Sequence, residues 1–406
     1  MSDPFLMVRA GHPDFLDLPW EVPINSWPDD VTVDLPSGVH RHPVVFVPYR
    51  SDIYAVKELT VALARHEFEV LRTLENHGAR SATPVGWVER PWMPPRDEGA
   101  GVIITRYVEF AFSYRELISS GGFGDRRSQM LDAFAVLLVE LHLLGCFWGD
   151  CSLSNVLYRY DAGAIEAVMI DAETVELHEQ LTAGQREHDL EIMIMNVAGG
   201  MADIAAEAGL DLDDADLSLG EDIAERYAQL WDELMHDEVI KSEERFKIRD
   251  RVSRLNDLGF DVEDYRLVPV ADGNRIRMRV TIGGRSFHSN KLRELTRIQA
   301  SENQARQILS DLQYYEAHHA ADRPSLKAIA AIQWRVGVFE PLLERIRRES
   351  PSSDPIQGYC DFLHHRYLMS VTAGRDIGSE LAFEDWLSLG RPGYDATQPR
   401  PGAADA

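Results

Sequence analysis

The chain has 406 residues, which exceeds a typical single domain and predicts at least two. Its 67 acidic residues outnumber 41 basic ones, and a formal net charge of −26 disfavours attraction of the whole chain to nucleic acid or anionic lipid. The three cysteines lack metal-type spacing, so we expect reduced thiols in a cytoplasmic protein. The N-terminus lacks the basic start and apolar core of a secretory signal, and charged residues interrupt the most apolar run, 131–148, so no membrane span is expected.

The N-terminal part of the chain changes from an irregular to a strand-like pattern. Residues 1–30 are rich in Pro, Asp and Trp without a sustained period, and we expect an arm that packs on the domain behind it. Runs of β-branched and aromatic residues at 31–35, 43–47 and 53–59 are separated by turn residues. This pattern predicts consecutive antiparallel strands, and an amphipathic helix is expected next, at 66–78.

Strand and helix patterns alternate further along the chain. Residues 101–108 read as a buried strand followed by a connector. Apolar residues at helical spacing predict a core helix over 131–145, and another helix is expected to begin near Gln185. These elements predict a mixed α/β class for the first half of the chain.

Between the two predicted helices lies a stretch with three polar residues suited to phosphoryl transfer. Asp150 is followed five residues later by Asn155, and Asp171 ends the apolar run 167–170. In phosphoryl transfer the protein mainly orients a hydroxyl group and holds Mg²⁺ on the phosphates. Mg²⁺ prefers oxygen ligands, so Asn155 and Asp171 are candidate metal ligands, and Asp150 is the candidate group that accepts or orients the hydroxyl.

These residues carry a resemblance to a known family. The segment W-G-D-C-S-L-S-N-V-L resembles the catalytic loop of the protein-kinase-like superfamily, and M-I-D-A-E stands where that superfamily has D-F-G. The loop is most similar to the atypical form of the RIO and lipopolysaccharide (Kdo-type) kinases. With its C-terminal half, the chain resembles an actinobacterial family of lipopolysaccharide-kinase-like proteins that carry a C-terminal domain of unknown function (DUF4032-type).

The resemblance implies a two-lobed protein-kinase-like α/β fold followed by a mainly helical domain with a β-hairpin. The expected parts are an N-terminal arm, a small lobe, a large lobe, the C-terminal domain and a disordered tail, at residues 1–30, 31–112, 113–225, 226–390 and 391–406.

The same resemblance implies ATP and Mg²⁺ as cofactors and assigns residues to the nucleotide. Lys57 in Y-A-V-K-E-L occupies the place of the strand lysine that contacts phosphates, and Glu67 best fits the helix glutamate that orients it, with Glu69 as the alternative. Thr105 would lie at the back of the adenine pocket. The backbone around Tyr107 and Val108 would face the base.

Two features depart from the family pattern. The loop that should cover the phosphates, L-P-S-G-V-H-R-H, has a single glycine, Gly38, although several glycines normally let backbone N–H groups approach phosphates. Side chains could take over that role, the candidates being Ser37, His40, Arg41 and His42. Asp171 is followed by Ala-Glu rather than Phe-Gly, and no activation segment is evident before the next helix.

Four further residues near the motif have expected structural roles. His142 is expected to be packed in the core, and Trp148 to support the loop. Asp189 resembles the helix aspartate that braces the catalytic loop in kinases. For Glu173 an exposed turn carboxylate is favoured over a metal ligand.

The second half of the chain contains helices and one hairpin. The acidic stretch 202–225 is expected to be a solvated connector, and continuous helical patterns are expected at 231–260 and 290–315. Strands at 265–270 and 275–282 would form the hairpin. The second strand would place three arginines on one face, Arg275, Arg277 and Arg279. For this basic surface, contact with the acidic lobe or with an anionic substrate is favoured over nucleic-acid binding. An ordinary solvated surface also explains the three arginines.

Two functional hypotheses follow. The first is an ATP- and Mg²⁺-dependent phosphotransferase that acts on an unknown hydroxyl-bearing acceptor or a protein partner. The second is a nucleotide-binding pseudokinase or scaffold whose C-terminal domain recruits a partner, which the single-glycine loop and the D-A-E sequence favour.

Overall fold

The structure is a computed structural model that describes residues 3–35, 41–119, 126–209, 214–241, 243–270, 275–319 and 327–394. The chain divides into two compact units, each described by itself below. Unit 1 comprises Met1–Tyr158 and Ala167–Glu238, and unit 2 comprises Arg159–Glu166 and Val239–Ala406. The boundary expected at residue 225 falls inside helix α6 (Leu219–Met235), which continues the apolar face of unit 1 through Tyr227 and Leu234.

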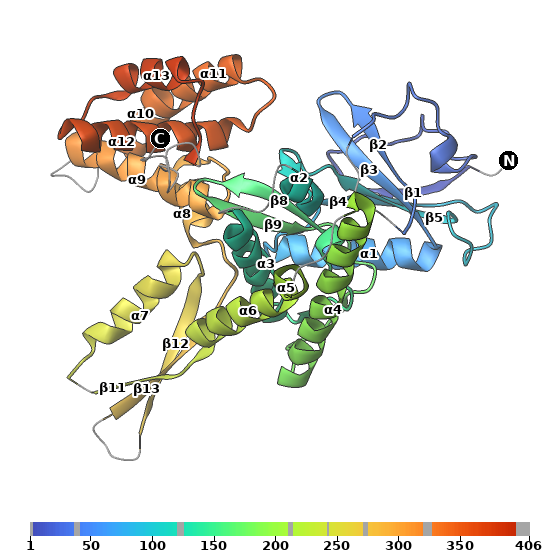
Figure 1. Cartoon of the computed structure of the whole chain (residues 1–406), viewed down its shortest axis with the longest axis horizontal. Helices are drawn as coiled ribbons and strands as arrows, with labels where there is room; N and C mark the ends of the chain where they lie inside the picture. The colour runs from blue at the N-terminus through green and yellow to red at the C-terminus, as the bar shows by residue number, and fades with distance from the viewer. Residues whose placement is uncertain are drawn as a thin grey trace. The chain divides into compact units, whose positions relative to one another are not determined.

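Unit 1 begins with a five-stranded antiparallel sheet (Figure 1). Its strand order is β1 (Phe5–Val8), β4 (Pro84–Glu89), β5 (Gly101–Arg106), β3 (Asp52–Leu59) and β2 (Val44–Tyr49). The expected arm supplies the edge strand β1, which pairs with β4. A strand at 31–35 was expected, but this segment makes a single bridge, from Val33 to Phe46.

The arm also contributes to the core of this sheet. Phe15, Trp20 and Trp27 are buried with aliphatic residues of the strands, including Val56 and Val102. Burial of large aromatic side chains stabilises a small sheet strongly. The arm is therefore part of the lobe rather than an appendage.

Helix α1 (Val61–Asn76) packs against β4 and β5 (Figure 1). The Thr60 hydroxyl accepts a hydrogen bond from the Leu63 N–H and caps the helix. The helix begins five residues before the expected start at 66, because Val61 and Ala64 extend the buried face toward the N-terminus.

The rest of unit 1 is mainly helical. Helices α3 (Arg126–Leu143) and α4 (Ala183–Ala208) both pack against α6. Short elements lie between or beside them: α2 (Tyr114–Ser119), η2 (Leu153–Asn155), α5 (Asp214–Leu217), β6 (Ala111–Phe112), β7 (Cys146–Phe147) and β10 (Glu176–Leu177). Strands β8 (Val156–Asp161) and β9 (Ala164–Met169) pair with each other, and their residues 159–166 belong to unit 2. The prediction of a solvated connector at 202–225 was wrong, since α4, α5 and α6 cover most of it and residues 210–213 lie outside the described residues. Buried apolar residues such as Ala205, Leu219 and Ile223 outweigh the acidic composition there.

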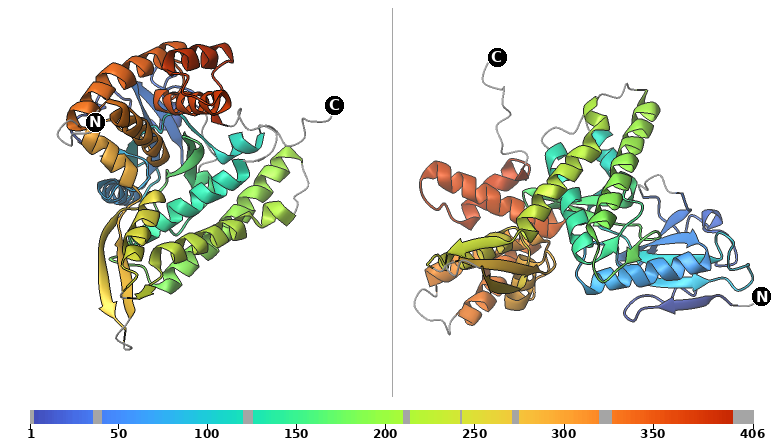
Figure 2. Two further views of the ribbon diagram at one scale, coloured as in Figure 1. Left: turned by 90° about the vertical axis from the view of Figure 1, so that its left-hand side faces the viewer. Right: turned by 90° about the horizontal axis from the view of Figure 1, so that it is seen from below.

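Unit 2 begins with a three-stranded sheet in the order β11 (Glu238–Lys241), β13 (Arg275–Ile282) and β12 (Val262–Pro269). The hairpin of β12 and β13 was expected, and the two strands lie side by side in Figure 2. The arginines at 275, 277 and 279 lie exposed on one face of β13, whereas Met278 between them is buried. The continuous helical pattern expected at 231–260 was wrong, because β11 separates α6 from α7 (Phe246–Asp257).

The remainder of unit 2 is helical, as expected. Its elements are α8 (Phe287–Thr296), α9 (Glu302–His319), α10 (Lys327–Trp334), a π-helical turn (Arg335–Phe339), α11 (Glu340–Glu349), α12 (Pro355–Ala373) and α13 (Ser379–Ser388). The helix expected over 290–315 is two helices, because Arg297 adopts a left-handed conformation with φ of 64° and ends α8. Residues 391–394 of the expected disordered tail are packed against unit 2, and 395–406 lie outside the described residues.

The mixed α/β class and the mainly helical C-terminal region with its hairpin are confirmed by this architecture. The described helices include none with the length and apolarity needed to cross a lipid bilayer. All three cysteines are buried free thiols: Cys146, Cys151 and Cys360.

Candidate functional site

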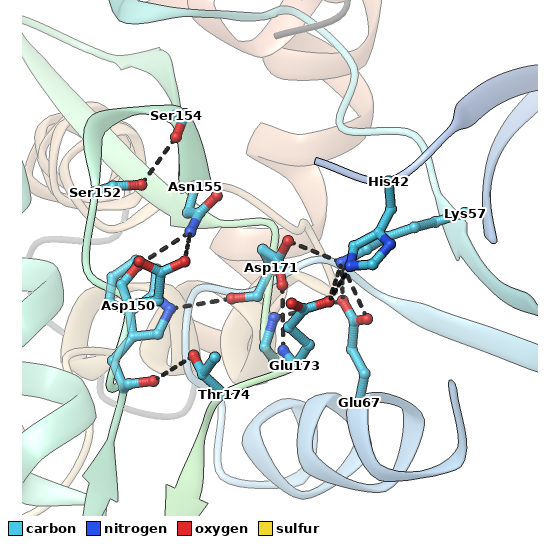
Figure 3. A network of polar contacts seen from close by, with 12 residues as sticks. His42, Lys57, Glu67, Asp150, Ser152, Ser154, Asn155, Asp171, Glu173 and Thr174 are labelled. Carbon is cyan, nitrogen blue, oxygen red and sulfur yellow. Dashed lines mark hydrogen bonds and ion pairs between the residues drawn. The ribbon is translucent and has the colours of Figure 1, made fainter. Parts of the chain in front are cut away.

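Strand β3 and helix α1 place a lysine beside a buried glutamate. The Lys57 ammonium lies 3.2 Å from Glu67 Oε2, and the Glu67 side chain is 1% exposed (Figure 3). Strand β3 is buried between β2 and β5, and α1 packs next to it, so both side chains are held by regular elements. Glu69, the alternative, is exposed and pairs with Arg72 on the same helix. The structure therefore brings Glu67, and not Glu69, to Lys57.

Two further carboxylates reach the same ammonium from the segment after β9. Asp171 Oδ2 lies 2.8 Å and Glu173 Oε2 lies 3.6 Å from Lys57 Nζ. Glu173 was expected to be an exposed turn carboxylate, but its side chain is 14% exposed because the turn folds back toward Lys57. Oxygen atoms of Glu67, Asp171 and Glu173 lie within 4.8 Å of one another, which is close enough to share a cation.

The charge balance of this cluster is negative, because three carboxylates surround one ammonium. Burial raises the pKa of Glu67 and Asp171 raises it further, so that despite Lys57 it reaches about 7. Burial lowers the pKa of Lys57, but Glu67 and Asp171 outweigh burial and raise it above its usual value. Lys57 is thus a firmly held cation in a site with surplus negative charge.

The proposed catalytic aspartate lies in the loop between β7 and β8. The Asn155 amide nitrogen donates to the Asp150 carbonyl oxygen at 3.0 Å and to its carboxylate at 3.3 Å. Asn196 on α4 donates to the other carboxylate oxygen at 2.9 Å. Burial raises the pKa of Asp150, these two amides lower it, and nearby carboxylates contribute to a net rise. Asn196 was not singled out in the sequence, because 41 residues separate it from Asn155 in the chain.

A buried aspartate braces this loop from α4. Asp189 accepts hydrogen bonds from the backbone N–H groups of Trp148 and Gly149, each at 2.8 Å, and contacts His142 Nε2 at 3.0 Å. Burial raises the pKa of Asp189, but the hydrogen bonds from His142, Trp148 and Gly149 outweigh it and hold the pKa below its usual value. His142 is packed in the core against Tyr227, as expected.

A second bond joins this loop to the metal-ligand candidate. The Trp148 indole N–H donates to the Asp171 carbonyl oxygen at 3.1 Å. Because the Trp148 side chain is buried, this hydrogen bond holds the backbone of Asp171 in place.

A cavity of about 130 Å³ opens beside Lys57. It is lined by Thr105, Tyr107, Val108 and Asp171, with apolar walls from residues such as Ala55, Ile103, Leu157 and Ile170. The Arg106 and Tyr107 N–H groups donate to Thr83 and Ile53 within the protein, so these two donors are already used. Small-molecule pockets usually measure about 300–1,000 Å³, so this cavity is smaller than such pockets.

The phosphate-covering loop is described only at its end. Ser37, Gly38 and His40 lie outside the described residues. His42 is buried between two carboxylates, with ring nitrogens 3.1 Å from Glu98 and 3.3 Å from Glu173. His42 therefore contacts the charge cluster rather than open solvent.

Two family models match separate parts of the chain. Residues 49–207 match the lipopolysaccharide kinase (Kdo/WaaP) family, and residues 229–389 match a domain of unknown function (DUF4032). The first part of the chain is thus similar to lipopolysaccharide kinases, and its C-terminal part is similar to DUF4032 domains. The resemblance inferred from the sequence is thereby confirmed, and the matched kinase region contains Lys57, Glu67, Asp150, Asn155 and Asp171.

Solved structures with partial similarity to the chain were also found. WaaP in complex with acyl carrier protein is 17% identical, with a TM-score of 0.34, over 55% of this chain and 87% of that chain. An aminoglycoside-3'-phosphotransferase of type VIII is 14% identical, with a TM-score of 0.29, over 48% of this chain and 93% of that chain. No curated protein is significantly similar to the chain.

Proposed function

We propose that unit 1 is an ATP- and Mg²⁺-dependent phosphotransferase that acts on a hydroxyl group. The observation that carries this proposal is the convergence of Lys57, Glu67 and Asp171 at one point beside a cavity. These residues come from a strand, a helix and a loop that are up to 114 residues apart in the chain. A lysine held by carboxylates beside a cavity is suited to orient phosphates.

The cavity would hold the base, and different lining residues would contact different parts of the nucleotide. Thr105 and the apolar walls would contact the adenine, and Val108 would offer the hinge backbone, since the Tyr107 N–H is already bonded. Mg²⁺, when bound, would neutralise charge on the phosphates. Asn155 and Asp171 offer the oxygen ligands that this ion prefers, and the surplus negative charge beside Lys57 fits a cation.

Asp150 would accept or orient the acceptor hydroxyl. Asn155 and Asn196 hold both of its carboxylate oxygens, so its orientation is fixed before an acceptor arrives. Its raised pKa moves it toward the range where a carboxylate can take a proton during the reaction. The acceptor is a hydroxyl-bearing small molecule or a hydroxyl on a protein partner.

The experiment that tests this function is Mg²⁺-dependent ATP binding together with γ-phosphate release by the purified chain. The wild type is compared with Asp171→Asn and Asp150→Ala. We expect binding with slow turnover in the wild type, weaker Mg²⁺-dependent binding in Asp171→Asn, and binding without turnover in Asp150→Ala. Turnover by Asp150→Ala at the wild-type rate would refute the role of Asp150. ATP binding without turnover in every protein and with every acceptor would replace the enzyme by a nucleotide-binding scaffold.

A further inference from the structure

Unit 2 contains a groove of about 910 Å³ along helices α9 and α12. The two helices lie side by side in Figure 1, and every lining residue belongs to unit 2. Two tyrosines in the groove face solvent, Tyr314 at 41% and Tyr367 at 64% exposure. Exposed tyrosines beside arginines are typical of protein-binding surfaces, because rigid aromatic rings give contact area at low entropic cost.

One end of the groove already holds a peptide side chain. The ring of Tyr394 stacks on His364, with centroids 4.1 Å apart and planes 13° apart, and its hydroxyl hydrogen-bonds to the Gln307 side chain. A Cβ atom at Gly163 would lie 2.7 Å from this ring, so a larger residue there would close the seat. The seat for Tyr394 is thus formed by Gly163, Gln307 and His364.

The backbone leading to this tyrosine is irregular and is also recognised. The Trp386 indole N–H donates to the Pro392 carbonyl oxygen at 3.0 Å, and the Arg391 guanidinium bonds to the Glu349 carbonyl oxygen and the Ser350 hydroxyl. A main-chain contact combined with one inserted side chain is a common way to bind an extended peptide. The segment Arg391–Tyr394 is thus held against unit 2 by one inserted ring and by contacts of its backbone and of Arg391.

Charged side chains of both signs line the rest of the groove wall. Arg366 lies 3.5 Å from Asp311 and 3.8 Å from Asp376, and its guanidinium lies over the Tyr314 ring at 5.3 Å. The Tyr314 hydroxyl donates to Asp376 at 2.7 Å. Asp311 and Asp376 balance the charges of Arg366 and of the exposed Arg306, so a neutral segment fits best.

We propose that this groove binds an extended, tyrosine-bearing segment of a partner protein, and that Arg391–Tyr394 competes with that segment for the same seat. This site takes a peptide and does not depend on phosphoryl transfer in unit 1.

The test uses the full-length chain and a fluorescein-labelled peptide with the sequence of residues 388–398. We expect saturable binding to Tyr394→Ala that is at least tenfold tighter than binding to the wild type, whose seat is occupied. Tyr394→Phe, which keeps the ring and loses the hydrogen bond to Gln307, should bind the peptide with intermediate affinity. A peptide with alanine in place of its tyrosine should not bind.

Two further variants distinguish binding at the Tyr394 seat from non-specific binding of the peptide. In the Tyr394→Ala background, Gly163→Leu should abolish peptide binding, whereas Gln313→Ala, at an exposed position of α9 that does not line the groove, should not change it. Circular dichroism shows whether each variant is folded. If Tyr394→Ala were unfolded, the peptide affinities of the wild type and of Tyr394→Phe would test the proposal instead. Equal binding of the two peptides, or equal affinity of wild type and both Tyr394 variants, would overturn the proposal.

Discussion

The ammonium of Lys57 lies closer to Asp171 than to Glu67, at 2.8 Å against 3.2 Å. Asp171 is the proposed metal ligand, and its carboxylate is bonded to the residue proposed to hold phosphates. A cavity of about 130 Å³ opens beside this ion pair, and Lys57 and Asp171 both line it. A metal ion bound at Asp171, as proposed, would share this carboxylate with Lys57, and Glu67 would still pair with Lys57.

The first prediction concerns Lys57. Lys57→Met should lower ATP turnover by about 100-fold or more, because a positioned charge on the phosphates is worth several kcal/mol in the transition state. Lys57→Arg should also lose most activity, since a planar guanidinium does not reproduce the position of the ammonium. Turnover is measured on variants that circular dichroism shows to be folded. The matched control is Lys247→Met, at a half-exposed lysine paired with Glu244, and it should keep wild-type turnover.

The second prediction is a pH dependence of stability that comes from Glu67. Burial and Asp171 raise its pKa in the folded state to about 7 from an ordinary 4.5, despite Lys57. Between these values the folded state binds more protons than the unfolded state, so the free energy of unfolding falls as pH rises through this window. The full effect is on the order of 3 kcal/mol.

Urea unfolding at pH 5 and pH 8 measures this effect. The wild type should lose more stability between the two values than Glu67→Gln does. Glu69→Gln is the control, because its carboxylate is exposed on the same helix, and it should follow the wild type. Parallel behaviour of wild type and Glu67→Gln would show that Glu67 does not titrate in this range.

Three residues of the site, Lys57, Glu67 and Asp171, could be picked out from the sequence for a physical reason. Lys57 and Asp171 follow buried apolar strand patterns, and Glu67 lies in a helix with clear periodicity, so local patterns fix the register of each residue. The choice of Glu67 over Glu69 followed from the apolar residues after it, and the structure brings Glu67 to Lys57. The catalytic, metal-binding and nucleotide-binding roles of these residues stay predictions.

Contacts formed by tertiary folding were missed. Asn196 lies on α4 among helix-forming residues, and no local pattern shows that it reaches Asp150. Glu173 looked like a turn residue, because its approach to Lys57 and His42 depends on how the turn packs. The sequence also could not predict that residues 159–166 belong to unit 2. The tip of a hairpin has the same sequence pattern whichever core it packs against.

The third prediction concerns the brace behind the catalytic loop. Asp189→Ala should destabilise the protein by about 3 kcal/mol, because it leaves the buried N–H groups of Trp148 and Gly149 without their acceptor. Since its pKa is lowered in the folded state, the contribution of Asp189 is present above the ordinary aspartate pKa and is lost as pH falls through the folded value. Chemical denaturation at neutral pH measures the loss. Asp132→Ala, at an exposed aspartate paired with Arg226, should change stability by less than about 1 kcal/mol. A similar loss in both variants would contradict the bracing role.

The last prediction assigns Asn196 a positioning role. Asn196→Ala removes one of the two side-chain amides that bond the Asp150 carboxylate and leaves Asn155 in place. We expect kcat to fall by about tenfold, with little change in KM for ATP, because the nucleotide cavity is not lined by this residue. Losing this hydrogen bond also raises the pKa of Asp150 further, since the Asn196 amide lowers it in the wild type.

The second readout of this variant is the pH profile of turnover. If Asp150 acts in its ionised form, the acidic limb of the kcat profile should move to higher pH in Asn196→Ala. Met195→Ala is the control, because this neighbouring α4 side chain is 74% exposed and should leave both kcat and the profile unchanged. A purely structural role of Asn196 would lower stability without moving the acidic limb. A reduced kcat with an unshifted profile would therefore show that Asn196 does not influence the ionisation of Asp150. A shift in the expected direction would support Asp150 as the titrating group in turnover.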